Sequence, residues 1–307
     1  MNTLNLLTKR TSKFIFAVAC INLVCLISST AVQAQSKKEV TKIAFKKDKF
    51  NRIFLPARVD NDTIALLFAT YSKTLRLTPY FYETRQLWPS WDRLMSTDKY
   101  GGPHSKSLFY LPKIEIGKLK FRNEETVINQ AFPDSIATGS TGTLMVYQYN
   151  WMIDNDRNEM SVSKAPFSPS QPFTTVSYKN NTFPTAIVNI SNVNSEFILD
   201  LGSGAGFLLS TTTAIGQAII EDYHLSPSRT VTSNIHSHKL VDTIYEAVIP
   251  KMTFNGIALK NQKVVLSSAA PHNVIGTGFL GNYNVILNNS KKRKIQSSFI
   301  LEKRLVD

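Results

Sequence analysis

The residues best suited to chemistry lie in one turn, the Asp-Leu-Gly-Ser segment at residues 200–203. The apolar segment before it, at residues 197–199, is short and precedes a glycine-rich run, which predicts a buried strand that ends on a carboxylate. The glycines let the backbone turn tightly. Apolar neighbours raise the proton affinity of a carboxylate, so Asp200 is a candidate acid or base. The same pattern also occurs in ordinary turns closed by an Asp side chain, so the turn alone leaves both interpretations open.

An internal repeat gives this turn a counterpart. Three pairs of segments match in the same order along the chain: residues 66–72 with 197–203, residues 111–114 with 249–252, and residues 141–155 with 275–289. Matches that recur in one order at nearly constant spacing indicate two copies of one structural unit. The counterpart of the Asp200 turn is the Ala-Thr-Tyr-Ser segment at residues 69–72.

Each copy is predicted to be mostly β-structure. Hairpins are indicated where apolar alternation flanks a turn, at residues 53–68, 114–121, 186–199 and 252–259. Helical pattern is sparse, and short helices are predicted after Pro79, at residues 213–223 and at residues 278–283. A Pro- and Ser-rich segment at residues 165–172 is predicted to link the two copies.

Each copy resembles one lobe of an aspartic peptidase of the retropepsin/pepsin kind. The family pattern is an Asp-Thr/Ser-Gly turn after an apolar strand, then a β-hairpin flap, then an apolar-apolar-Gly segment before a short helix. The second copy matches this pattern with Asp200 and Gly276, and Gly142 is the matching glycine of the first copy. The resemblance implies an all-β, pepsin/retropepsin-like acid-protease fold with two homologous closed-barrel-like lobes, at residues 35–164 and 173–307, and a cleft between them.

The resemblance also implies a chemistry for which the chain is incomplete. An aspartic peptidase brings two carboxylates together, one ionised to take a proton from water and one protonated to polarise the scissile carbonyl. Asp200 is expected to be one of them, supported by Gly202 and the hydroxyl of Ser203. The first copy has Ala69 in place of the second Asp and Tyr71 in place of the glycine, and its Thr70 and Ser72 complete the degenerate turn.

Two functions follow from this pattern, and the sequence does not decide whether the chain is an enzyme. One is an exported aspartic-peptidase-like protein that acts on or binds extended peptide segments in the cleft, with Asp200 as its only catalytic-type Asp. The alternative is a catalytically inactive pseudo-peptidase that binds a peptide or protein segment as an added strand. Leu201 replaces the Thr or Ser that links the two turns in the family, which argues against turnover.

A homodimer is a further possibility, because two chains could pair their second lobes and bring two copies of Asp200 together. The first lobe, which is expected to occupy that face, argues against this arrangement. We expect Tyr71 to fill the space that the missing carboxylate leaves.

Two segments are candidates for the flaps, at residues 96–110 and 230–243. Their candidate substrate-binding residues are Gly101, Gly102, Asn234, His236 and His238. Two histidines in His-x-His spacing on a strand point to one face and suggest a metal. No third ligand follows from the spacing, so solvated flap histidines are the favoured interpretation, and neither a metal nor a cofactor is expected.

The first 34 residues resemble a secretory signal peptide, with a basic start, an apolar stretch at residues 14–27 and small residues before Ala34. A short membrane anchor is the alternative, but we expect no stable membrane insertion once the leader is removed. Export places the protein in the periplasm or outside a bacterial cell. Both cysteines lie in the leader, so no disulfide is expected.

The chain is basic. Loss of the leader removes three basic residues and lowers the formal net charge from +13 to +10. Export argues against nucleic acid as the partner of this charge, so the basic run at residues 291–294 is interpreted as a solvated turn.

Overall fold

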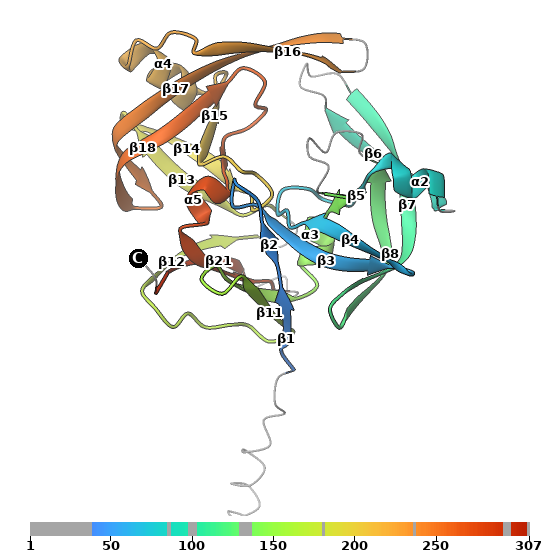
Figure 1. The fold of residues 1–307 in the computed structure, drawn as a ribbon. Coiled ribbons are helices and arrows are strands. Elements are labelled where there is room, and N and C mark those ends of the chain that lie inside the picture. Colours follow the sequence, from blue (N-terminus) through green and yellow to red (C-terminus); the bar gives the residue numbers. More distant parts are fainter. Residues whose placement is uncertain are drawn as a thin grey trace, which may run out of the picture. The chain divides into compact units, whose positions relative to one another are not determined.

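A computed structural model gives the structure of residues 39–84, 87–97, 103–128, 137–179, 182–235, 238–290 and 296–305. The compact unit Val40–Asp307 is built mainly of strands, so the all-β prediction is confirmed (Figure 1). The predicted leader lies outside the described residues. No described helix is long and apolar enough to cross a membrane.

The elements of the first half, in chain order, are β1 (Thr41–Ala44), β2 (Lys46–Lys47), β3 (Ile53–Val59), β4 (Asp62–Leu67), β5 (Leu75–Leu77), α2 (Pro79–Thr84), β6 (Trp88–Thr97), β7 (Pro103–Ile116), β8 (Leu119–Ile128), β9 (Gly139–Ser140), α3 (Thr143–Val146), β10 (Asn150–Asp154) and β11 (Glu159–Ser163). Those of the second half are β12 (Phe173–Tyr178), β13 (Thr185–Ile190), β14 (Val193–Leu199), β15 (Phe207–Ser210), α4 (Ala214–Asp222), β16 (Arg229–Ile235), β17 (His238–Phe254), β18 (Ile257–Ser267), β19 (Val274–Ile275), α5 (Thr277–Leu280), β20 (Tyr283–Asn288) and β21 (Ser297–Lys303).

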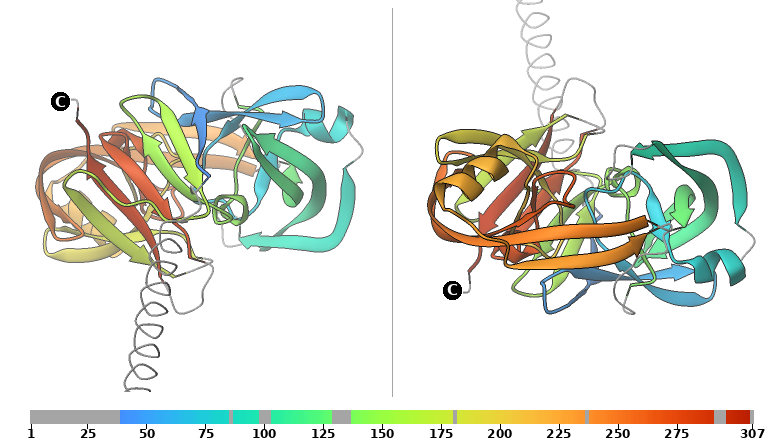
Figure 2. Two further views of the ribbon diagram at one scale, coloured as in Figure 1. Left: turned by 90° about the horizontal axis from the view of Figure 1, so that it is seen from below. Right: turned by 90° about the horizontal axis from the view of Figure 1, so that it is seen from above.

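The two halves form two closed six-stranded barrels with equivalent strand orders. Figure 2 shows the strands of both halves in two further views. The first has the order β3-β4-β9-β5-β8-β7, and β7 pairs with β3 to close it. The second has the order β13-β14-β19-β15-β18-β17, and β17 pairs with β13. Each strand of one barrel therefore has a counterpart in the other, as two copies of one unit require.

Tight turns set the register of the predicted hairpins. The β13–β14 turn has Ser191 and Asn192 at φ of +51° and +64°, and the β17–β18 turn has Asn255 and Gly256 at +46° and +83°. Two central residues with positive φ form a turn whose twist matches that of the flanking strands. Asn and Gly reach this region at little cost, which is why the sequence signalled these hairpins.

The predicted helices are present, one of them shifted. Helix α4 begins after Thr213, whose hydroxyl accepts a hydrogen bond from the Gly216 amide as an N-cap. The last helix was expected to extend to residue 283, and this was wrong. Helix α5 ends at Leu280, because Tyr283 already pairs with Lys303 in the next sheet.

A third sheet joins the halves, in the order β1-β11-β10-β20-β21-β12. Its central pair, β10 and β20, aligns Met152 with Ile286, Trp151 with Leu287 and Ile153 with Val285. The repeat matches Met152 to Ile286, so exchange of the two copies leaves this register unchanged. The pair Met152–Ile286 therefore marks a local two-fold axis between the halves.

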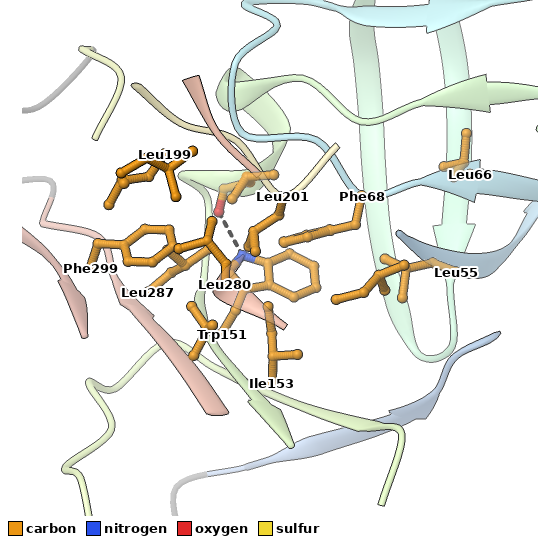
Figure 3. Packing of buried hydrophobic residues seen from close by; sticks show 14 of the residues in the cluster. Leu55, Leu66, Phe68, Trp151, Ile153, Leu199, Leu201, Leu280, Leu287 and Phe299 are labelled. Carbon is orange, nitrogen blue, oxygen red and sulfur yellow. Dashed lines mark hydrogen bonds between the residues drawn. The ribbon is translucent and has the colours of Figure 1, made fainter. Parts of the chain in front are cut away.

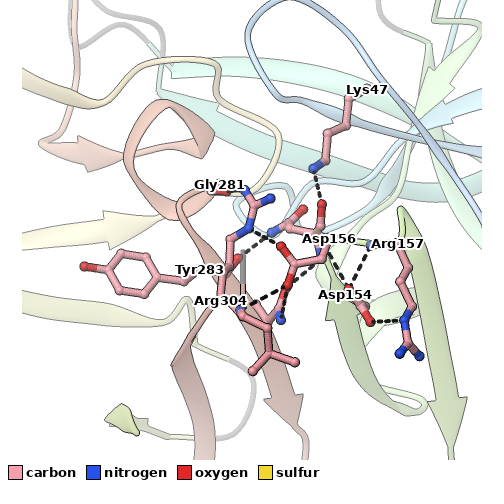
Figure 4. A network of polar contacts seen from close by, with 10 residues as sticks. Lys47, Asp154, Asp156, Arg157, Gly281, Tyr283 and Arg304 are labelled. Carbon is pink, nitrogen blue, oxygen red and sulfur yellow. Dashed lines mark hydrogen bonds and ion pairs between the residues drawn. The ribbon is translucent and has the colours of Figure 1, made fainter. Parts of the chain in front are cut away.

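A polar network lies beside this junction (Figure 4). The carboxylate of Asp156, in the β10–β11 turn, accepts hydrogen bonds from Arg304 Nε at 2.5 Å and from Asn284 Nδ2 at 3.3 Å. Asn155 donates to the carbonyl of Tyr283 at 2.5 Å. These bonds attach the turn of the first half to the last strands of the second.

Most buried apolar residues of both barrels and of the joining sheet belong to one cluster, part of which is drawn in Figure 3. Trp151 of β10 is 1% exposed, its ring lies 5.1 Å from that of Phe68, and its indole N–H donates to the Val146 carbonyl at 2.7 Å. Phe68 directly precedes the degenerate turn, and Leu201, also 1% exposed, directly follows Asp200. Both turns are thus anchored in the core that joins the halves.

Replacement of Trp151 by Ala is expected to lower the free energy of unfolding by about 3–5 kcal/mol, because it leaves a cavity and removes the indole hydrogen bond. Urea unfolding of the wild type and the variant measures the change. The matched control is Tyr80→Ala, which removes an aromatic ring that is 58% exposed and is expected to change stability by less than about 0.5 kcal/mol. Equal losses in the two variants would contradict the structural role given to Trp151.

Candidate functional site

The structure brings the two predicted turns together. Asp200 follows β14, and its Oδ1 accepts hydrogen bonds from the amide of Gly202 at 2.9 Å and from the amide of Thr70 at 3.2 Å. The first donor belongs to the same turn and the second to the turn of the other half. The carboxylate therefore lies where the two copies meet.

Thr70 links the turns by its hydroxyl. Its Oγ1 donates to the carbonyl of Leu199 at 2.9 Å and accepts from the amide of Leu201 at 3.1 Å. Thr70 is 2% exposed, so these bonds satisfy polar groups that water does not reach. Leu201 occupies the equivalent place in the second turn and has no hydroxyl. The Thr70 hydroxyl therefore bonds to the backbone of the second turn, but no equivalent side-chain bond runs from Leu201 to the first turn.

Gly202 is required by the close approach of the first turn. A Cβ atom at residue 202 would lie 2.7 Å from the Cβ of Ala69, closer than two such atoms can approach. The methyl group of Ala69, which stands where the repeat would place a second Asp, is buried against this glycine. It supplies neither a proton acceptor nor a donor.

The two glycines that the repeat aligns, Gly142 and Gly276, pack closely against the backbone of the turns. A Cβ at Gly276 would lie 2.4 Å from the carbonyl oxygen of Ser203, and one at Gly142 would lie 2.3 Å from the carbonyl carbon of Thr74. The amide that follows each glycine then donates to its turn, that of Thr277 to the Ser203 carbonyl at 2.7 Å. In the first half, the amide of Thr143 donates to the Ser72 carbonyl in the same way.

The expected support of Asp200 by the Ser203 hydroxyl stays a prediction. Ser203 Oγ accepts from the amide of Ala205 at 3.4 Å, and the Ser203 amide donates to the backbone carbonyl of Asp200 at 3.2 Å. The described hydrogen-bond donors of the Asp200 carboxylate are all backbone amides.

Burial raises the pKa of Asp200, although the residue keeps some exposed surface. The backbone amides of Gly202, Thr70 and Tyr71 and the charge of Arg76 lower it and oppose this effect only in part. No carboxylate is among the described groups that shift this pKa. Within the described part of the chain, Asp200 therefore has no second carboxylate with which to share a proton.

The Tyr71 side chain, which we expect to fill the space of the missing carboxylate, contacts aromatic residues of the second half. Its ring makes edge contacts with Phe183, at a centroid distance of 4.9 Å, and with His272, at 5.9 Å, both from the second half. Burial raises the pKa of the Tyr71 phenol, and the nearby charge of Asp200 raises it further. The phenol is therefore a neutral donor beside Asp200.

Arg76, whose charge lowers the pKa of Asp200, was missed in the sequence analysis. It lies on β5 between the buried Leu75 and Leu77, and its pKa is lowered by burial and raised by Asp200 and Tyr71. The repeat contained a signal: the matching strand, β15, has Leu208 at this position. A charged residue at a position that is apolar in the other copy was evidence for a local function.

Both flap candidates lie in hairpins. Strand β6 pairs with β7, and β16 pairs with β17 from Arg229–Ile244 to Ile235–His238. The tips at residues 98–102 and 236–237 lie outside the described residues, and so do the candidates Gly101, Gly102 and His236. Asn234 and His238 are placed by their strand pairing alone. The described residues contain no group of three side chains that could hold a metal ion.

Replacement of Thr70 by Val, which has the same shape, is expected to lower the free energy of unfolding by about 1–3 kcal/mol. It leaves the buried amide of Leu201 and carbonyl of Leu199 without a partner. Urea unfolding provides the measurement. Thr63→Val on the exposed side of β4 is the matched control and is expected to be nearly neutral. A Thr70 variant as stable as the control would show that the hydroxyl link contributes nothing.

The raised pKa of Asp200 predicts a pH-dependent stability difference. A carboxyl whose pKa is higher in the folded protein stabilises it fully below the unfolded pKa, near 3.8, and loses this contribution as pH rises through the folded pKa. Asp200→Asn should therefore gain stability relative to the wild type between pH 4 and pH 7, by about 1.4 kcal/mol for each unit of the shift. Urea unfolding of both proteins across this range tests it. A difference that stays constant with pH would contradict the raised pKa.

In comparisons with known proteins, the chain matches no protein-family model and no curated protein.

Proposed function

We propose that the chain is an exported, catalytically inactive aspartic-peptidase-like protein that binds an extended peptide segment in a cleft between its lobes. The observation that supports this most directly is the contact of Ala69 with Gly202. The turns meet as a pair of catalytic turns would, but a methyl group stands at the position of one of the two carboxylates.

The missing carboxylate is decisive for turnover. Peptide hydrolysis by a carboxylate pair needs one group to take a proton from water while the other gives one to the carbonyl oxygen. Each such role contributes roughly 10²- to 10⁴-fold to the rate. Asp200 alone can perform one role at a time, and the neutral phenol of Tyr71 is too weak an acid to perform the other as a carboxyl does.

Binding needs less than catalysis does. A peptide in extended form can add to a sheet edge through main-chain hydrogen bonds. The hairpins β6–β7 and β16–β17 offer such edges on both sides of Asp200 in this proposal. A protonated Asp200 donates a hydrogen bond to a peptide carbonyl, and burial favours that protonated form.

Peptidase activity is the second candidate, supported by the retained Asp200 with its amide donors from both turns. A dimeric dyad is the less favoured route to it. Thr70 and Ala69 of the same chain already occupy the space against Asp200 and Gly202, so a second Asp200 could enter only if the two halves separated.

The test uses the mature chain, residues 35–307, and a random octapeptide library between pH 3 and pH 7. We expect retention of peptides without cleavage, and binding about 2- to 10-fold weaker in Asp200→Ala because one hydrogen bond is lost. Asp222→Ala, at an exposed position at the end of α4, is the control and should bind as the wild type does.

Cleavage that disappears in Asp200→Ala but persists in Asp222→Ala would overturn the proposal in favour of an active peptidase. Neither cleavage nor binding by a folded protein would reject both functions.

A further inference from the structure

Two cations of the first half are linked by charge to the candidate site: Arg76 interacts with Asp200, and Lys106 interacts with Arg76. Arg76 is on β5, and Lys106 is on β7, the second strand of the first flap hairpin. Each is partly buried, and burial is the main cause of the lowered pKa of each. The charge of Arg76 lowers the pKa of Lys106 further, so the two side chains share one region.

The backbone explains why Arg76 faces this region. Leu75 and Leu77 are buried in the first barrel, and side chains alternate along a strand, so Arg76 points out of the barrel. Its strand partner on β9 is Ser140, which directly precedes Thr141. Thr141 in turn holds the degenerate turn, because its hydroxyl accepts from the Ala69 amide at 2.9 Å. Strand pairing and this hydrogen bond thus connect the Arg76 backbone to the Asp200 site.

The charges in this region do not balance. In the described part of the chain, Asp200 is the only carboxylate that shifts the pKa of Arg76, and none shifts that of Lys106. No described residue within hydrogen-bond or ion-pair distance accepts from either side chain. A partly buried guanidinium without an acceptor has lost water contacts that a ligand anion would replace.

We propose that Arg76 and Lys106 bind a carboxylate of the peptide next to Asp200, so that the site selects peptides with an acidic side chain or a free carboxyl terminus there. This inference rests on the proposed peptide binding and names the class of peptide. The planar guanidinium can hold a carboxylate by two parallel hydrogen bonds, and the ammonium of Lys106 adds a second charge from the flap hairpin.

The second barrel supports a local function for Arg76. Leu208 holds the equivalent position on β15 and is tolerated there, so an apolar side chain suits this strand. The charge at residue 76 is therefore not needed for the barrel itself.

The experiment compares peptides that differ only in one carboxylate. Octapeptide libraries with Glu or Gln fixed at each position in turn, each with a free or an amidated carboxyl terminus, are measured for binding to the mature chain. We expect the wild type to prefer a carboxylate at one position by about 10- to 100-fold, as a charged hydrogen bond predicts. The Glu/Gln arm identifies a side chain as its source, and the acid/amide arm identifies the terminus.

Three variants and one control test whether Arg76 and Lys106 cause the preference for a carboxylate. Arg76→Leu, which copies the second barrel, should reduce the preference to less than about 3-fold. Lys106→Gln should reduce it partly, and the control Lys120→Gln, at an exposed position on β8, should not alter it. Arg76→Lys keeps the charge and the fold without the planar fork, and should retain an intermediate preference.

The outcomes separate this inference from the proposed function. If peptides bind with no preference for a carboxylate, the inference is wrong and the proposed function stands. The same holds if the preference is undiminished in both Arg76→Lys and Lys106→Gln. Absence of binding to every library would overturn the proposed function, and the inference with it.

Discussion

The two halves of the chain meet at one crowded point, and much of the site depends on it. Residue 202 lies so close to Ala69 that a Cβ atom there would come within 2.7 Å of the Ala69 methyl group, so only glycine fits. This closeness lets an amide of one turn reach the carboxylate of the other, and lets one hydroxyl bond to both sides of Asp200 in the chain. It is maintained by the pairing of β10 with β20 and by the core around Trp151.

The same crowding explains the electrostatics. The turns partly bury the carboxylate, and this burial raises its pKa more than the amides and the guanidinium lower it. A dyad would divide a proton between two groups. Here a single carboxyl and a set of fixed donors and cations remain, which is an arrangement suited to recognition of carbonyl and carboxylate groups.

Much of the fold could be predicted from the sequence. The repeat, the turn residues such as Asn255-Gly256 and the alternation of strands are local patterns, and these predicted two β lobes and their hairpins. Asp200 and Ala69 could be paired from the sequence because the repeat aligns them. The all-β architecture with two barrels is confirmed, whereas the cleft and the peptide within it stay a prediction.

The rest depended on contacts that no local pattern encodes. The hydrogen bond that Ser203 Oγ accepts from the Ala205 amide was not predicted, because it depends on the path of the backbone after the turn. The link that Thr70 makes between the turns, and the interaction of Arg76 with Asp200, arise from residues that are far apart in sequence. Comparison of the two copies would have pointed to Arg76, because Leu208 shows what the strand needs for folding alone.

The register of β10 and β20, which is unchanged when the copies are exchanged, is the register that two separate identical chains would adopt. In such a dimer every substitution appears twice, so the loss of one acid would remove both, and a glycine needed on one side would be needed on the other. A tandem chain escapes this rule. Ala69, Tyr71 and Arg76 of one copy differ from their counterparts Asp200, Gly202 and Leu208 in the other. Covalent linkage thus allows one half to carry the carboxylate and the other half to supply different surroundings for it.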